Sequence, residues 1–165
     1  MTVPEHIVVI GPMGVGKTTT AVATATALGR PVRDSDADIE ADTGRTGRAI
    51  AEADGVPALH ALEAAVLLDA LGGDTPSVIA AAASVVDRED CRRALAAPFV
   101  VTLDLDPEPL LERIGTGRHR RSITLAEIAA LIERREPALA AVADLRLDAR
   151  RPADQLVRAI VAAVS

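Results

Sequence analysis

The sequence has 165 residues, of which 49% are hydrophobic, so we expect one globular domain with its own core and not a disordered chain. The net charge of −6 and a single aromatic residue, Phe99, argue against a general nucleic-acid binder, which needs positive charge and stacking surfaces. No apolar run is long enough to cross a membrane, Glu5 and His6 interrupt any secretion signal, and the single cysteine, Cys91, excludes an internal disulfide, so we expect a cytoplasmic protein.

The first predicted strand covers residues 6–10, a short apolar run rich in β-branched side chains. A helix is predicted from Thr19 to Leu28, and Gly29 ends it. Between them, residues 11–18 read Gly-Pro-Met-Gly-Val-Gly-Lys-Thr, which matches the G-x-x-x-x-G-K-[ST] pattern of a phosphate-binding P-loop. A strand before the motif and a helix after it are the context that this loop requires.

Each residue type in this motif has a chemical reason. Gly11, Gly14 and Gly16 permit backbone angles that let successive N–H groups point at an anion, and the helix N-terminus adds about half a positive charge. Lys17 is expected to reach the β- and γ-phosphates, and the Thr18 hydroxyl is expected to bind Mg²⁺. The alternative is a glycine turn that matches by chance. The flanking strand and helix favour nucleotide binding, whereas catalysis is a separate prediction.

A second strand over residues 31–33 runs into an acidic cluster over residues 34–38. In an open α/β sheet, ligands bind beyond the carboxyl ends of the strands. Asp34 and Asp36 are two residues apart, so on an extended chain they face the same way. One carboxylate could orient Mg²⁺ through water, and the other could accept a proton or a hydrogen bond from a substrate hydroxyl. The spacing is equally compatible with a solvated acidic turn that caps the next helix.

Short helical segments follow the second strand. They are predicted over residues 39–43, over residues 46–53, and from Pro57 to the glycines at 72–73. Residues 34–73 therefore form a helical insertion between two strands, which could shape a substrate pocket.

Three further strands are predicted over residues 77–80, 99–103 and 145–147. They alternate with helical segments, which indicates an α/β fold with a parallel sheet. No repeat or long linker divides the chain, so residues 1–165 are expected to form a single domain.

The helices between these strands have recognisable starts. Asp87 could cap a helix over residues 88–96, and Pro107 opens a helix that reaches about Ile114. Apolar residues at helical spacing over residues 156–164 predict an amphipathic helix at the C-terminus.

A strongly basic segment occupies residues 115–121 of this acidic protein. Phosphoryl transfer needs positive charge over the moving group and exclusion of water, so residues 115–123 are predicted to form a mobile lid. The alternative is an exposed arginine-rich turn that offsets local acidity.

The segment after this basic loop begins with a capping-box pattern over residues 124–127. The helix that it opens is expected to reach about Arg135 and to be broken by Pro137. By position alone, Arg135 is an ordinary arginine at a helix end.

Several short motifs follow one another along the chain. They are the P-loop at 11–19, Asp-Ser-Asp-Ala-Asp-Ile-Glu at 34–40, Thr-Gly-Arg at 43–45, Ile-Ala-Glu at 50–52, Leu-Glu at 62–63, Val-Ile-Ala at 78–80, Leu-Asp-Leu-Asp-Pro at 103–107, Arg-Glu-Pro at 135–137 and Val-Ala-Asp at 142–144. This combination resembles the shikimate kinases over nearly the full length. The resemblance implies a three-layer P-loop kinase fold, with a five-stranded parallel sheet flanked by helices and a mobile lid. It also implies transfer of the γ-phosphoryl group of ATP to the 3-hydroxyl of shikimate, with Mg²⁺.

The resemblance also implies roles for residues on the nucleotide side. It assigns nucleotide binding to Gly11, Gly14, Val15, Gly16, Lys17, Thr18, Thr19, Arg113, Arg151 and Pro152. Lys17, Asp34 and the lid residue Arg120 match catalytic positions, and Thr18 and Asp34 match the positions linked to Mg²⁺. By position alone, the segment that holds Arg151 and Pro152 could equally be an ordinary charged loop with no contact to the nucleotide.

The substrate side departs from the family pattern. Asp36 matches the aspartate that binds substrate hydroxyls, and Arg135 matches one of two arginines that hold the substrate carboxylate. His60 replaces the other arginine, which is expected to weaken carboxylate binding by about 1.5–3 kcal/mol. Residues 81–84, Ala-Ala-Ala-Ser, replace the family's T-G-G-G, so Ala82 and Ala83 bring methyl groups to the acceptor site.

We therefore predict a monomeric, cytoplasmic, Mg²⁺- and ATP-dependent kinase that phosphorylates shikimate or a similar small hydroxylated acceptor, with no nucleic-acid or membrane partner. One alternative is a different acceptor, such as a polyol, cyclitol or sugar acid, and another is a non-catalytic regulatory nucleotide-binding relative. The retained Lys17, Asp34 and Arg120 argue against a non-catalytic protein. A nucleotide or nucleoside kinase is disfavoured because the chain lacks aromatic residues to stack a base.

Overall fold

The computed structural model describes residues 5–116 and 123–165, with the side chains of residues 115 and 116 excepted. Its elements are β1 (Ile7–Gly11), α1 (Lys17–Leu28), β2 (Val32–Asp34), α2 (Ser35–Thr43), α3 (Gly47–Asp54), α4 (Val56–Leu71), β3 (Val78–Ala82), the 3₁₀ helix η1 (Ala83–Asp87), α5 (Glu89–Ala94), β4 (Phe99–Asp104), α6 (Pro107–Thr116), α7 (Leu125–Val142), β5 (Leu145–Asp148) and α8 (Ala153–Val164). None of the helices in these described ranges is both long and apolar enough to cross a membrane.

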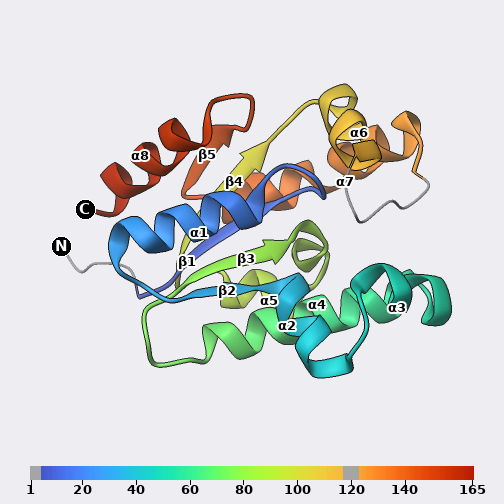
Figure 1. The fold of residues 1–165 in the computed structure, drawn as a ribbon, viewed down its shortest axis with the longest axis horizontal. Coiled ribbons are helices and arrows are strands. Elements are labelled where there is room, and N and C mark those ends of the chain that lie inside the picture. The colour runs from blue at the N-terminus through green and yellow to red at the C-terminus, as the bar shows by residue number, and fades with distance from the viewer. Residues whose placement is uncertain (1–4, 117–122) are drawn as a thin grey trace.

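The five strands form one parallel sheet in the order β2-β3-β1-β4-β5 (Figure 1). The strand β1 is central, with Val9 opposite Ala80 of β3 on one side and Val101 of β4 on the other. The expected five-stranded parallel sheet is therefore confirmed. Because β1 is central, the loop that follows it opens at the middle of the sheet's carboxyl edge, where β3 and β4 also end.

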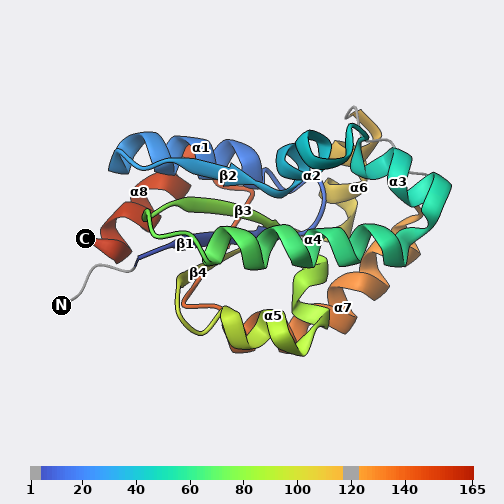
Figure 2. The ribbon, with the colours of Figure 1, turned by 90° about the horizontal axis from the view of Figure 1, so that it is seen from below.

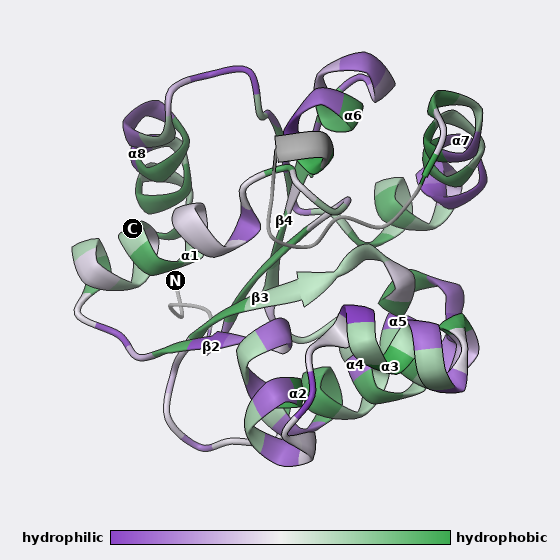
Figure 3. Ribbon diagram, turned by 45° about the vertical axis from the view of Figure 1, so that its right-hand side comes forward, coloured by the Kyte–Doolittle hydropathy of each residue, from purple (hydrophilic) through white to green (hydrophobic). Residues whose placement is uncertain are grey.

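Helices cover both faces of the sheet, and strand residues alternate between two cores. Ile7 and Val9 belong to the core beneath α1 and α8, whereas Val8 and Ile10 belong to the core that contains α4, α5 and the end of α7. Figure 2 shows α1 and α8 on one side of the strands and α5 and α7 on the other. Hydrophobic residues run along the strands, and hydrophilic ones appear on the surrounding helices (Figure 3). The expected three layers are present.

The helical insertion has a small core of its own. Ile39 of α2, Ile50 of α3 and Val66 of α4 are buried against one another, apart from the two cores of the sheet. The Thr46 side chain caps α3 by accepting a hydrogen bond from the Ala49 N–H at 3.1 Å. Packing of this kind fixes the insertion beside the sheet, and it lies at one end of the molecule in Figure 1.

The prediction that Pro137 breaks its helix is wrong. The helix α7 continues from Leu125 to Val142 with Pro137 inside it. A proline within a helix removes one hydrogen bond and costs about 3 kcal/mol. Beyond it, Leu139 is buried in the core on that face of the sheet, and Ala138 and Val142 pack against the same core. Burial of this second half of α7 offsets the cost of the proline.

Candidate active site

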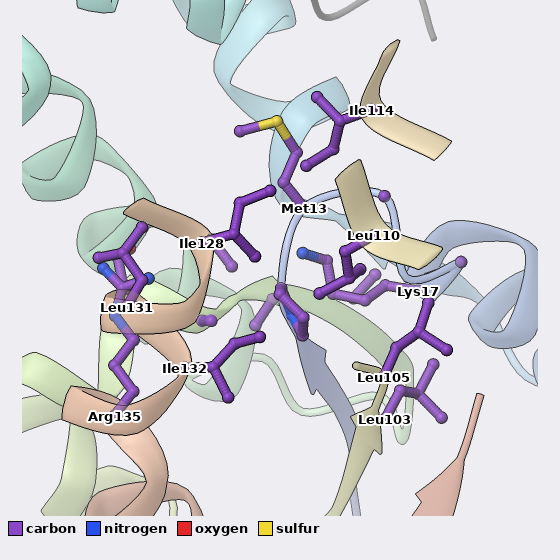
Figure 4. A pocket seen from close by; sticks show the side chains of 18 of the residues that line it. Met13, Lys17, Leu103, Leu105, Leu110, Ile114, Ile128, Leu131, Ile132 and Arg135 are labelled. Atoms are coloured by element: carbon purple, nitrogen blue, oxygen red, sulfur yellow. The ribbon is translucent and has the colours of Figure 1, made fainter. Parts of the chain in front are cut away.

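A large cavity lies at the carboxyl edge of the sheet. The P-loop, the start of α2, one face of α4, the ends of β3, β4 and β5, and parts of α6 and α7 line it. Figure 4 shows Leu110, Ile114 and Ile128 across from Met13 and Lys17 of the P-loop. Its volume of about 1210 Å³ exceeds the roughly 300–1,000 Å³ of a typical pocket for one small ligand. The cavity can therefore hold two molecules, such as a nucleotide and an acceptor.

The P-loop has the backbone conformation that phosphate binding requires. Gly14 and Gly16 have φ values of 81° and 99°, which residues other than glycine rarely adopt. The Val15 N–H donates to the Pro12 carbonyl at 3.2 Å and closes the turn. The helix α1 begins at Lys17, two residues before the expected start, so its positive end lies at the loop.

Lys17 is held inside this loop. It is the only lysine in the sequence, and its Nζ donates to the Gly11 carbonyl oxygen at 2.7 Å. Burial lowers the pKa of the Lys17 ammonium, while Asp36, Glu63 and Asp34 oppose that change. Three carboxylates of the same cavity therefore act electrostatically on this one ammonium group.

Asp34 accepts hydrogen bonds from three partners at once. Its Oδ2 accepts a hydrogen bond from the Thr18 hydroxyl, and its Oδ1 accepts hydrogen bonds from the Asp36 and Ala37 N–H groups at 2.9 and 3.2 Å. It therefore caps α2, as one interpretation of the acidic cluster expected, and it also contacts the P-loop. The expectation of an extended chain through Asp36 is wrong, because α2 already begins at Ser35. Both carboxylates nevertheless line the cavity.

The Thr18 and Asp34 oxygens form a donor set that suits Mg²⁺. This ion keeps several waters and is usually bound through one or two carboxylates together with the phosphates of a nucleotide. Among residues 5–116 and 123–165, no three His, Cys, Asp or Glu side chains come together as a metal cage. The hydroxyl of Thr18 in contact with one carboxylate therefore fits an Mg²⁺ ion that the nucleotide phosphates help to hold.

Glu63 of α4 is a cavity residue to which the sequence motifs assigned no role. Its side chain is buried, and its Oε1 accepts a hydrogen bond from the Ser84 hydroxyl at 2.9 Å. Burial raises the pKa of the Glu63 carboxyl, and the nearby Asp36 charge acts in the same direction. The only signal in the sequence was its place in the Leu62-Glu63 motif, since a glutamate on an amphipathic helix is normally exposed.

Glu63→Gln is expected to stabilise the protein at neutral pH. Because the folded-state pKa of Glu63 lies above the ordinary value of 4.5, stability is lost as the pH rises from 4.5 through that pKa. Glutamine is uncharged and retains an oxygen for Ser84, so we expect a gain of about 0.5–2 kcal/mol at pH 7.5 and little change at pH 4. Denaturant unfolding at both values measures this. Exposed Glu52→Gln is the control, and a variant less stable than the wild type at pH 7.5 would contradict the prediction.

Arg135 lines the cavity from α7, and its side chain is only 11% exposed. It pairs with Asp87, the last residue of η1, with Nη2 and Oδ2 3.1 Å apart. The prediction that Asp87 caps the next helix is wrong, because α5 begins at Glu89 and the N-cap position is Arg88. The Asp87 carboxylate binds Arg135 instead.

The predicted nucleotide residues outside the P-loop occupy different positions. Arg113 donates from Nη1 to the Val15 carbonyl at 3.1 Å and from Nη2 to the Ala149 carbonyl at 3.3 Å, so it ties α6 to the P-loop. Neither Arg113 nor Arg151 nor Pro152 lines the cavity, whereas the neighbouring Arg150 does. Arg120 and most of the predicted lid lie outside the described residues.

Comparison with known proteins decides the family. The family model described as shikimate kinase matches residues 13–165. The chain belongs to the shikimate kinase family. It is therefore a P-loop phosphotransferase that acts on a hydroxyl group. The shikimate kinase of Symbiobacterium thermophilum is 40% identical over 149 residues, which cover 86% of this chain and 85% of the relative. The shikimate kinase of Salinispora tropica is 35% identical over 88% of this chain and 89% of its own length.

A solved structure of the family carries its substrate. The shikimate kinase from Acinetobacter baumannii in complex with shikimate superposes with a TM-score of 0.90, at 28% identity over 99% of this chain and 93% of that one. The P-loop kinase fold is therefore confirmed over the whole described chain.

The residues at which this chain departs from the family pattern line the same cavity. They are His60 of α4, Ala82 at the end of β3 and Ala83 at the start of η1, and Asp36 and Arg135 line the cavity with them. The structure thus brings the predicted acceptor residues together. Ser84, at the position of the third family glycine, is the residue that hydrogen-bonds Glu63.

Proposed function

We propose that this kinase transfers the γ-phosphoryl group of ATP to the 3-hydroxyl of shikimate. The observation that carries the proposal is one cavity that contains a P-loop lysine, the Thr18–Asp34 pair and Arg135. The solved relative of the same fold, which is described as a complex with shikimate, supports this acceptor. Family membership supports ATP as the phosphoryl donor.

In this mechanism the P-loop and Lys17 hold and neutralise the phosphates, because the ammonium and the loop N–H groups face the same space. We assign Asp34 to accept the proton of the attacking hydroxyl and, with Thr18, to hold Mg²⁺. When bound, Mg²⁺ neutralises charge on the β- and γ-phosphates. The hydroxyl oxygen forms a bond to the γ-phosphorus, the bond to the bridging oxygen of ADP breaks, and ADP leaves.

On the acceptor side, Arg135 binds the carboxylate and Asp36 binds the hydroxyls of shikimate. Arginine suits the first task because its planar, permanently charged fork matches a carboxylate. His60 contributes a weaker partner, since a histidine is mostly neutral at pH 7. Residues 34–73 form the acceptor-binding part of the single domain, and the family resemblance assigns a catalytic role to Arg120, which lies outside the described residues. We further propose that the enzyme is cytoplasmic, because its one cysteine is a buried free thiol, as in a reducing compartment. We also propose that it acts as a monomer.

The test is ADP release from Mg²⁺ATP, measured with and without shikimate, with the Lys17→Ala protein as the blank. Release that depends on shikimate supports the proposal. ATP binding without such release would refute shikimate as the acceptor.

His60→Arg is expected to lower the KM for shikimate by about tenfold, because the substitution restores a charged fork for the carboxylate and such hydrogen bonds contribute about 1.5–3 kcal/mol. The KM for ATP should stay within about twofold, since the family resemblance assigns position 60 to the acceptor and not to the nucleotide. Steady-state kinetics with each substrate varied in turn measures both constants. His60→Gln is the control for a change of shape without charge, and an unchanged KM for shikimate in His60→Arg would show that carboxylate capture is not limiting.

A further inference from the structure

The contact between Arg135 and Asp87 joins two separate elements through three hydrogen bonds. Arg135 donates from Nε to both Asp87 oxygens at 3.3 Å and from Nη2 to Oδ2 at 3.1 Å, across 48 residues of sequence. The Arg135 side chain is 11% exposed and that of Asp87 is 36% exposed. Asp87 itself does not line the cavity, whereas its partner Arg135 does, so Asp87 can affect contacts with a ligand there by holding Arg135.

The pairing determines which edge of the guanidinium remains available. An arginine carries five N–H groups, one on Nε and two on each Nη. Asp87 takes the edge formed by Nε and Nη2. The other edge is formed by Nη1 and the second Nη2 hydrogen, and within the described part of the chain it makes no hydrogen bond that would compete with a ligand. That edge is a two-donor fork of the kind that binds a carboxylate side by side.

We infer that Asp87 is a positioning residue for acceptor binding, which holds Arg135 so that its Nη1–Nη2 edge meets the acceptor carboxylate. This inference rests on the proposed function, in which Arg135 binds that carboxylate. The role matters more in this chain than in a pocket with two arginines, because His60 stands where the second arginine would be. Of the two family arginines that hold the acid, only Arg135 is then present, so its orientation matters more.

A second effect of Asp87 has the opposite sign. Its negative charge repels the acceptor carboxylate, so a purely electrostatic role predicts tighter acceptor binding when Asp87 is neutralised. A positioning role predicts weaker binding. Arg134 also approaches Asp87, with Nη2 3.7 Å from Oδ2, but its side chain is 64% exposed and solvent screens its contribution. Because Arg135 is largely enclosed, we expect the loss of orientation to outweigh the relief of repulsion.

The experiment compares Asp87→Ala and Asp87→Asn with a matched control, Asp90→Asn. Asp90 makes a similar two-oxygen contact with Arg88, at 3.1 and 2.9 Å, but neither residue lines the cavity. We expect Asp87→Ala to raise the KM for shikimate about tenfold and Asp87→Asn, which keeps one acceptor oxygen, about threefold. The kcat and the KM for ATP should stay within about twofold in both variants, and Asp90→Asn should resemble the wild type.

A double variant tests whether Asp87 acts through Arg135. If it does, adding Asp87→Ala to Arg135→Ala leaves the KM for shikimate unchanged, because no guanidinium remains to be oriented. An equal rise on both backgrounds overturns the inference, as does an unchanged or lowered KM in the single Asp87→Ala variant. Neither of those results affects the proposed function. Wild-type protein without shikimate-dependent turnover would instead overturn the proposed function. An unaltered KM for shikimate in Arg135→Ala would overturn the assignment of Arg135, and the inference with it.

Discussion

Lys17→Ala is expected to lower kcat/KM for ATP by roughly 10³-fold, because losing one preorganised donor to a developing charge already costs about 10²–10³. The Lys17 ammonium is the charged group of the P-loop, and its Nζ lies 2.7 Å from the Gly11 carbonyl, inside the curve of the loop. A coupled assay of ADP release at saturating shikimate measures the effect.

Folding should survive this change. Burial lowers the pKa of Lys17, so the fold disfavours its charged form, and the unfolding midpoint should shift little when that charge is removed. Lys17→Met, which keeps most of the side-chain length, provides a second variant. Turnover within a few-fold of the wild type in both variants would refute the P-loop assignment.

Asp34→Asn is expected to reduce kcat by about 10²–10³, because an amide can neither accept the proton of the acceptor hydroxyl nor offer a negative charge to Mg²⁺. The helix cap should survive, since asparagine is as good an N-cap as aspartate. Asp34→Ala removes both functions, and it should lose the same activity and also about 1 kcal/mol of stability. Parallel measurements of kcat and of denaturant unfolding separate the two roles.

Thr46→Ala supplies the matched control for the cap. Thr46 caps α3 through one hydrogen bond to the Ala49 N–H, and its removal should cost about 1 kcal/mol with no loss of kcat. If Asp34→Asn keeps wild-type turnover, then Asp34 serves only as a cap. If Thr46→Ala loses activity as strongly as Asp34→Asn, the effect belongs to the insertion as a whole and not to the carboxylate.

The strands and the P-loop could be predicted because their signals are local. The apolar run of β1, the glycines of the loop and the helix after it are neighbours in sequence, and each constrains the next. The parallel sheet followed from the alternation of strands and helices, and the motif order identified the family. Asp34 could be singled out as a candidate site residue for the same reason, because it lies at the end of the second strand.

The features that could not be predicted depend on partners far away in sequence. Asp87 precedes a helical segment and resembles a cap, but its carboxylate binds an arginine 48 residues later. Pro137 looks like a helix end until Leu139 is known to be buried in the core. The pairing of Ser84 with Glu63, 21 residues apart, likewise exists only once η1 and α4 are packed together. In each case tertiary contacts outweigh a local preference.

The P-loop lysine is also the only side-chain amine in the protein, since every other permanently charged cation in the sequence is an arginine. An acylating reagent aimed at ε-amines therefore has a single side-chain target. Burial lowers the pKa of that amine, which favours its uncharged, nucleophilic form. Protein grown with lysine that carries an isotope label at the ε-nitrogen would give one side-chain resonance, from the amine of the P-loop. Nucleotide occupancy can thus be followed spectroscopically at one atom, with no mutation and no extrinsic probe.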